Sequence, residues 1–245
     1  MAKFHGKNVR AYIDGVDISG YTNTVNIEQS ADTVDVSAFG SANKEYVVGL
    51  YDSKATHSGF FDDTADVGST ILANRIGSSV NFMMLMGTSP GQYGFAGSAE
   101  LENSYSVNSS IGGAITHKVA LSNSGTQGID PTFTIASRGT IGAAGTTAAV
   151  TTTPTSVAGG RAYIQNFGSY GLPAGQAQGA LGTVFLIGAA DAAFTSGTAV
   201  IAAFGSQGTA PSASGMPFTG TAQFMKLLQG GGTFRPQVAV AVDLN

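Results

Sequence analysis

The stretch of sequence that decides the fold is residues 9–63, VRAYIDGVDISGYTNTVNIEQSADTVDVSAFGSANKEYVVGLYDSKATHSGFFDD. Polar and apolar residues alternate through much of it. Alternation with a period of two is typical of β-strands that bury one face and turn the other toward water. The apolar members of this alternation are Val25, Ile27, Val34 and Val36. In addition, Asp14-Gly15 between apolar residues predicts a tight hairpin turn. We therefore expect antiparallel β-structure here.

Strand patterns continue beyond this stretch. Leu101, Tyr105 and Val107 share one parity, and the residues of the other parity are Glu100, Glu102, Ser104 and Ser106. Ser79–Met86 and Thr183–Ala189 are continuous apolar runs, which are typical of strands covered on both faces. Further strands are predicted at Thr198–Phe204, Ala222–Leu228 and Gln237–Val242.

One segment has a helical pattern instead. Its apolar residues are Val67, Ile71, Leu72 and Ile76. Acidic residues crowd its beginning at Asp62, Arg75 lies near its end and Gly77 follows. Acidic residues at the N-terminus, a basic residue at the C-terminus and a terminal glycine all match the physics of helix ends. The sequence predicts a single helix over about residues 62–77.

Composition excludes several classes of protein. The 245 residues include no Cys, so a disulfide framework, a thiol nucleophile and a thiolate metal site are all excluded. With 15 Asp and Glu against 11 Lys and Arg, the formal net charge is −4, which argues against a protein that mainly neutralises nucleic-acid phosphates. We expect no membrane helix and no secretion signal.

The charge is unevenly divided along the chain. Residues 139–245 hold only 3 Lys and Arg and 2 Asp and Glu. A segment of Gly, Ala, Thr, Ser, Val and Pro, residues 139–160, lies at the change in composition. Such a segment predicts a domain boundary. We expect one domain over residues 1–145 and an all-β domain over residues 146–245.

Residues capable of catalysis or metal binding are sparse. His5, His57 and His117 stand alone without the spacing of metal ligands, and we interpret them as strand or interface residues. No nucleophile motif of the GxSxG type is present. We therefore expect no catalytic, cofactor-binding or metal-binding residues, no cofactor and no enzymatic activity.

The ordered motifs of the N-terminal third resemble a known family, the major tail tube proteins of long-tailed, siphovirus-type bacteriophages. The motifs that carry the resemblance are DGVDISGY (Asp14–Tyr21), SADTVDVSAFG (Ser30–Gly40), KEYVVGLYD (Lys44–Asp52) and KATHSGFFDD (Lys54–Asp63). The resemblance implies a mainly β fold, an antiparallel β-sandwich or barrel of the tail-tube type with one flanking α-helix. It also implies subunits that assemble into hexameric rings, which stack into a hollow tube through which the genome leaves the virion.

The resemblance implies partners and a location as well. The chain would bind itself within and between rings, and would contact the tape measure protein and DNA non-specifically in the lumen. Tail terminator and distal tail proteins would bind the ends of the tube, and no membrane partner is expected. The protein would be assembled in the host cytoplasm and reside in the virion tail. A mildly acidic lumen lets DNA slide, so we interpret Glu28, Glu100 and Glu102 as lumen-facing.

In this family a long loop between early strands reaches a neighbouring subunit or ring, and by position that role falls to Ser30–Leu50. We expect apolar burial to dominate assembly, because each buried side chain of this kind contributes roughly 1.5–3 kcal/mol. The alternative is that these side chains lie in the subunit's own core. The proposed subunit and ring interface consists of Val34, Val36, Phe39, Tyr46, Val47, Val48 and Leu50.

Several alternatives stay open. The C-terminal half is either a decoration on the outside of the tube or a degenerate second tube domain, in which case three chains complete a ring. Two short repeats support duplication, Arg10–Ile13 with Arg161–Ile164 and Ala38–Ser41 with Ala203–Ser206. The rival functions are the tube protein of a contractile injection or secretion system and a non-viral surface β protein.

Overall fold

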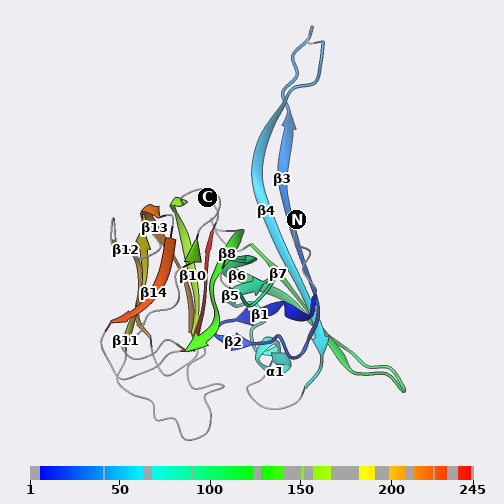
Figure 1. Cartoon of the computed structure of the whole chain (residues 1–245). Coiled ribbons are helices and arrows are strands. Elements are labelled where there is room, and N and C mark those ends of the chain that lie inside the picture. The colour runs from blue at the N-terminus through cyan, green and yellow to red at the C-terminus, as the bar shows by residue number, and fades with distance from the viewer. Residues whose placement is uncertain are drawn as a thin grey trace, which may run out of the picture. The chain divides into compact units, whose positions relative to one another are not determined.

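The computed structural model of the chain is built almost entirely from β-strands (Figure 1). It describes residues 6–40, 42–62, 68–89, 91–123, 128–140, 150–151, 157–166, 182–190, 199–207, 212–222, 224–230 and 237–243. The helical elements there are the 3-10 helix η1 (Gly6–Asn8) and the short helix α1 (Gly68–Ala73). The strands are β1 (Arg10–Ile13), β2 (Val16–Asp17), β3 (Thr22–Asp35), β4 (Tyr46–Phe60), β5 (Ser79–Leu85), β6 (Tyr93–Asn108), β7 (Thr116–Ser122), β8 (Ile129–Thr140), β9 (Val150–Thr151), β10 (Val157–Asn166), β11 (Gly182–Ala189), β12 (Ala199–Gln207), β13 (Ser212–Ala222), β14 (Phe224–Gly230) and β15 (Gln237–Asp243). The predicted mainly β, antiparallel fold is confirmed.

The chain divides into two compact units. Unit 1 contains Met1–Gly20, Val80–Ser98 and Asp130–Asn245, and unit 2 contains Tyr21–Ser79 and Ala99–Ile129. The predicted boundary between residues 145 and 146 lies outside the described residues, so the division into a tube domain and a C-terminal domain stays a prediction. Strands from both sides of that position pair within unit 1, since β15 pairs with β8.

Unit 1 contains two β-layers. Its larger sheet has the strand order β13-β10-β15-β8-β6-β5-β1-β2, and its smaller sheet has the order β12-β11-β14-β9. Strands β10 and β13 of the larger sheet contact β12 of the smaller one, and β13 also contacts β11. The predicted C-terminal strands are confirmed as β11, β12, β14 and β15, with ends shifted by at most three residues.

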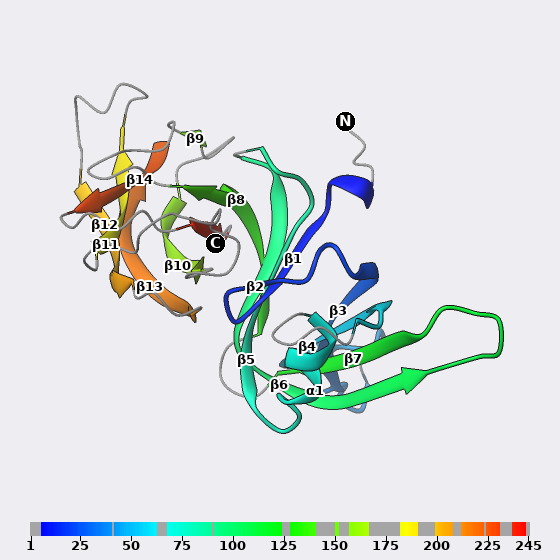
Figure 2. The same ribbon diagram turned by 90° about the horizontal axis from the view of Figure 1, so that it is seen from below.

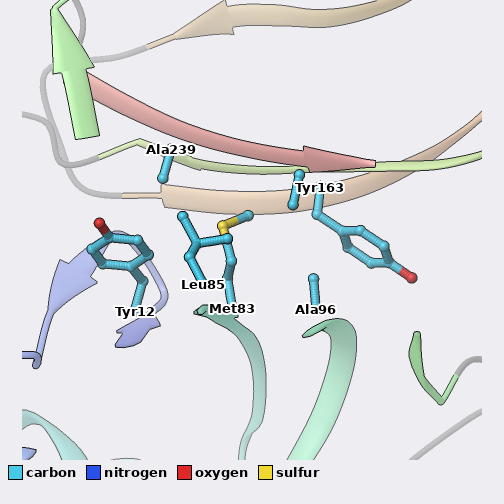
Figure 3. Packing of buried hydrophobic residues seen from close by; sticks show 7 residues of the cluster. Tyr12, Met83, Leu85, Ala96, Tyr163 and Ala239 are labelled. Carbon is cyan, nitrogen blue, oxygen red and sulfur yellow. The ribbon is translucent and has the colours of Figure 1, made fainter. Parts of the chain in front are cut away.

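A hydrophobic cluster fills the interior of unit 1 (Figure 3). Tyr12 on β1 and Leu85 on β5 face Ala239 on β15 across the cluster. The sheet order separates β1 from β15 by several strands, so the larger sheet curves until its inner face packs against itself. The cluster consists of Tyr12, Met83, Leu85, Ala96, Tyr163, Ala239 and Ala241, all at most 2% exposed.

A buried glutamine fastens this curved sheet at the β1–β2 turn. The Gly15 backbone N–H donates to Gln165 Oε1 at 2.6 Å, and Gln165 Nε2 donates to the Asn81 carbonyl oxygen at 3.0 Å. The turn itself is the one predicted from the sequence, with φ of 46° at Asp14 and 78° at Gly15. Positive φ at both central residues is the signature of a type I′ hairpin turn.

Unit 2 holds the part of the larger, eleven-stranded sheet in which β3, β4, β7 and β6 are neighbours in that order. On β4 and β7 one face is buried, and its members are Ala55, His57, Gly59, His117, Val119 and Leu121. The opposite face is half-buried or exposed, with Lys54, Thr56, Ser58, Lys118, Ala120 and Ser122. The period-two pattern of one covered and one wet face is thus confirmed on these strands.

The helix is shorter than its sequence pattern predicts. It spans Gly68–Ala73 instead of about residues 62–77, and residues 63–67 lie outside the described part of the chain. The Asp62 backbone N–H donates to Ser69 Oγ at 3.0 Å. Gly77, predicted to follow the helix directly, lies four residues beyond Ala73. It adopts a φ of 79° in a separate turn in which the Ser78 N–H donates to the Arg75 carbonyl oxygen at 2.8 Å.

The members of the first short repeat lie in the same kind of element, and the members of the second do not. Arg10–Ile13 forms β1 and Arg161–Ile164 lies in β10, so both are strands of the same sheet. Ala38 and Gly40 lie in the connection between β3 and β4, whereas Ala203–Ser206 lies inside β12. The second repeat therefore does not join equivalent elements.

Candidate assembly surface

Among the described strands, none pairs with the outer part of the β3–β4 hairpin as a third strand. Strand β4 pairs with β7 only through Lys54–Phe60, whereas its pairing with β3 continues outward as far as Asp35↔Tyr46. Figure 1 shows β3 and β4 as a long two-stranded ribbon. A lone two-stranded hairpin is marginally stable in water, so its outer half is suited to gaining further contacts in an assembly. We call residues 29–53 the arm.

All seven predicted interface residues are exposed in the single chain, so the alternative that they form its own core is excluded. The long loop predicted over Ser30–Leu50 is mostly strand, because β3 extends to Asp35 and β4 begins at Tyr46. Of the seven residues, Val36 and Phe39 lie in the connection between the two strands. The expected buried face at Val34 and Val36 is likewise absent. Their exposed fractions are Val34 57%, Val36 44%, Phe39 112%, Tyr46 54%, Val47 54%, Val48 56% and Leu50 81%.

The arm is apolar on both faces. Tyr46 and Val48 lie on one face of β4, and Val47 lies on the other, where it pairs with Val34. The register shift between the pairs Ala31↔Tyr51 and Thr33↔Val48 places Tyr51 on the same face as Val48. Tyr51, 79% exposed, was missed by the sequence reasoning, although its position next to Leu50 in the same strand could have indicated it. A surface hairpin of an isolated protein normally turns polar side chains to water on at least one face. Eight of the 15 exposed large apolar side chains in the described residues lie between Val34 and Tyr51.

The connection at the end of the arm is held by polar contacts. Asp35 Oδ1 accepts from the Ser37 backbone N–H at 3.0 Å, and Ser37 Oγ accepts from the Glu45 backbone N–H at 2.9 Å. Hydrogen bonds to Asp35 from the Ser37 side chain and the Ser37 backbone N–H lower the pKa of that carboxyl from its usual value. Lys44 Nζ lies 3.5 Å from Asp35 Oδ2 and 6.0 Å from the Tyr46 ring centroid. The arm is therefore an ordered hairpin with a defined end.

The three carboxylates predicted to face a lumen are placed unequally. Glu28 is exposed on β3, where its Oε1 accepts from Asn26 Nδ2 at 2.8 Å and its backbone pairs with Lys54. Glu100 and Glu102 lie in β6, and their side chains are outside what the structure describes. The assignment of these residues to a lumen stays a prediction.

A β-bulge interrupts the parity on which that prediction rests for Glu102. The pairing of β6 with β7 shifts register between Glu102, which pairs with Leu121, and Ser104, which pairs with Ala120. An extra residue in one strand reverses the alternation beyond it. The prediction that Glu102 and Ser104 share one face of the strand was therefore wrong, because their backbone partners Leu121 and Ala120 are consecutive residues of β7.

A second hairpin extends from the sheet of unit 2. Strands β6 and β7 continue to a turn in which the Gly113 N–H donates to the Ser110 carbonyl at 3.1 Å and Gly112 has a φ of 79° (Figure 2). Ile111 is fully exposed at its end, and Val107 and Ile115 are about half exposed. It is a smaller apolar feature than the arm.

The described residues contain no cluster of three or more His, Cys, Asp or Glu side chains that is placed to hold a metal ion. His57 and His117, predicted as strand residues, lie in β4 and β7, and His5 lies outside the described residues. Among the described residues, no helix is both long enough and apolar enough to span a bilayer.

No protein-family model matches this chain, and a search of curated proteins finds no match. Among solved structures, the chain is similar to one in the virion of a native gene transfer agent particle, with 19% identity and a TM-score of 0.41 over 52% of this chain and 98% of that one. It is also similar to a chain of the anti-feeding prophage baseplate, with 7% identity and a TM-score of 0.36 over 53% and 97%. The Dit protein of phage SPP1 matches with 12% identity and a TM-score of 0.32 over 96% and 98%.

Proposed function

We propose that this chain is a structural virion protein that polymerises into stacked rings and forms the hollow tail tube of a long-tailed phage, the conduit for genome delivery. The observation that carries the proposal is the arm, a two-stranded hairpin with apolar side chains exposed on both faces. Contiguous exposed apolar surface of this kind marks a site of protein association.

The energetics favour burial of the arm against another subunit. Burying one apolar side chain contributes roughly 1.5–3 kcal/mol, whereas association costs roughly 4–15 kcal/mol in lost freedom. The seven proposed interface side chains, although already partly covered, together supply stabilisation of the same order as that cost. Exposed ion pairs such as Lys44–Asp35 contribute little in comparison.

The strand edges support a closed assembly of identical subunits. In the described sheets β3 pairs only with β4, so its other edge is unpaired. An unpaired edge is a template for a further strand, and ring closure removes such edges. In this assembly the chain's main partner is itself, with the tape measure protein and DNA in the lumen and the terminator and distal tail proteins at the tube ends. The rings are hexameric in this proposal.

The experiment is a paired substitution in the arm. Tyr46→Asp combined with Val48→Asp places two charges on one face of β4, and we expect a folded subunit that no longer forms hollow filaments in negative-stain microscopy. Wild-type protein at the same concentration should form filaments with a regular ring repeat. Circular dichroism and the unfolding midpoint of the variant establish that it is folded.

The matched control makes the same chemical change outside the arm. Val200 on β12 is 58% exposed, and Val200→Asp should leave the filaments intact. Filaments formed by the arm variant would contradict the role of the arm. Wild-type protein that stays a single subunit at high concentration would contradict the tube itself. Counting subunits in one ring separates six chains from three.

A further inference from the structure

Two histidines lie side by side inside unit 2, at the base of the arm. His57 on β4 and His117 on β7 are each 1% exposed, and their ring centroids are 5.2 Å apart. The register pairs His57 with Val119 and His117 with Gly59, so the two rings are diagonal neighbours on the buried face. Two titratable groups are thus held close together away from water.

The surroundings of the pair are packed. Thr22 Oγ1 on β3 lies 2.7 Å from His57 Nε2, and the Tyr105 ring on β6 stacks on His117 with centroids 6.0 Å apart. Gly59 leaves the space that His117 occupies, because a Cβ atom there would lie 3.1 Å from His117 Cε1. Little room is left for the rings to separate without moving the strands.

No described contact supplies the negative charge that an imidazolium would need. Within the described residues, neither histidine takes part in an ion pair. Tyr105 on β6 is a titratable neighbour, because it pairs with Val119, the residue that also pairs with His57. The backbone of Glu102 lies one row away, paired with Leu121, and α1 carries no charged residue. Lys54 and Lys118 belong to the opposite, exposed face.

Burial therefore keeps both rings neutral. Burial, with a smaller contribution from the nearby His117, lowers the pKa of His57 to about 4. Burial also lowers the pKa of His117, although its contact with the Phe60 backbone opposes part of that change. A proton added to either ring would create a buried cation, and a second proton would add repulsion across 5.2 Å.

We propose that the His57–His117 pair is an acid-sensitive element, whose protonation loosens the strands at the base of the arm. The pair occupies the segment Lys54–Phe60, the part of β4 that joins the arm to β7. Loosening of the Lys54–Phe60 segment frees the arm from the sheet that orients it, and the pairing within the arm itself stays unchanged. This inference concerns unit 2 alone and does not depend on tube formation.

The direction of the effect follows from linkage. Because the pKa of His57 in the folded chain is about 4 and its ordinary value is 6.5, the unfolded segment binds the proton more tightly. The stability contributed by the neutral pair is complete above about pH 6.5 and is lost as the pH falls toward 4. From His57 alone, the ratio of open to closed base rises about 50-fold between about pH 7 and about pH 4.5.

The test is hydrogen exchange of the full chain read by mass spectrometry. Amide protection of peptides covering Lys54–Phe60, corrected for the intrinsic pH dependence, should fall tens of fold between about pH 7 and about pH 4.5. In His57→Gln combined with His117→Gln, the fall should be less than about threefold. His5→Gln, which removes a histidine outside the pair, should behave as wild type.

A second measurement needs no variant and stays decisive if the double variant does not fold. Exchange at the imidazole C2 position gives the titration midpoint of each histidine in the wild-type chain. Midpoints well below 6.5 for both rings are expected. Midpoints near 6.5, or equal loss of protection in wild type and double variant, would overturn the proposal. Tube formation enters neither readout, so failure here and failure of the proposed function are distinguishable.

Discussion

Two short apolar strands of this chain differ in solvent exposure: one is buried and the other is exposed. Strand β1, Arg10–Ile13, buries Ala11, Tyr12 and Ile13 almost completely, whereas the outer part of β4, Tyr46–Tyr51, exposes nearly every large side chain. Both are apolar and both are strands. The difference is in their neighbours, since β1 pairs with β2 on one side and with β5 on the other, while the outer part of β4 pairs, among the described strands, with β3 alone. Apolar sequence thus marks a surface to be covered, within the subunit or by another one.

The largest expected contrast comes from truncating one residue of each segment. Ile13→Ala removes a side chain with 0% exposure from a packed interior, and should cost roughly 2–5 kcal/mol of unfolding free energy. Leu50→Ala acts on a side chain that is 81% exposed, and should change the stability of the single subunit by less than about 0.5 kcal/mol. Denaturant unfolding of dilute protein measures both. Equal losses would mean that the arm is covered within the subunit.

Two glycines of β4 allow the covered and the exposed parts of that strand to be compared directly. A Cβ atom at Gly59, in the covered base of β4, would lie 2.1 Å from the Tyr21 carbonyl oxygen. Gly59→Ala should therefore force a backbone shift and destabilise the fold by roughly 1–3 kcal/mol. At Gly49 in the arm the nearest atom would be Asp32 Cβ at 3.2 Å, so Gly49→Ala should be tolerated with a small adjustment. Thermal unfolding of the two variants distinguishes these outcomes.

The covering of β1 depends in part on the buried Gln165. Gln165→Ala leaves the Gly15 N–H and the Asn81 carbonyl without this partner, and should cost roughly 1–3 kcal/mol. Gln165→Glu keeps the acceptor for Gly15 and loses the donor to Asn81, so it separates the two bonds. Exchange of the Gly15 amide should accelerate in the first variant more than in the second. Unchanged exchange in both would show that packing alone holds the turn.

Local signals of the sequence were reliable where the chemistry is local. The positive φ at Asp14-Gly15 follows from the residue types that tolerate it. The strands β5, β11, β14 and β15 follow from runs of apolar residues. The helix was predicted too long at its C-terminal end, because Ile76 fits the helical spacing although α1 ends at Ala73.

The sequence predicted which apolar residues make up the candidate surface, but it did not predict that most of them lie in a two-stranded hairpin. The sequence indicated apolar residues around Tyr46 and Val48, and left open whether they lie in the core. It did not indicate that Ser30–Leu50 is mostly paired strand, because alternation looks the same in a covered and an uncovered hairpin. The bulge at Glu102 and Ser104 was missed for a related reason: a register shift depends on the partner strand, here β7.

By itself, the sequence determined that this is a cysteine-free, antiparallel β protein with little charge and a concentration of apolar residues near its beginning. Those properties follow from residue types and their spacing, which act over a few positions. Only the tertiary structure decided which apolar strand is covered, how Gln165 reaches Gly15 and that His57 meets His117. Such contacts join residues far apart in the chain, and the free energy of burial depends on what arrives from elsewhere.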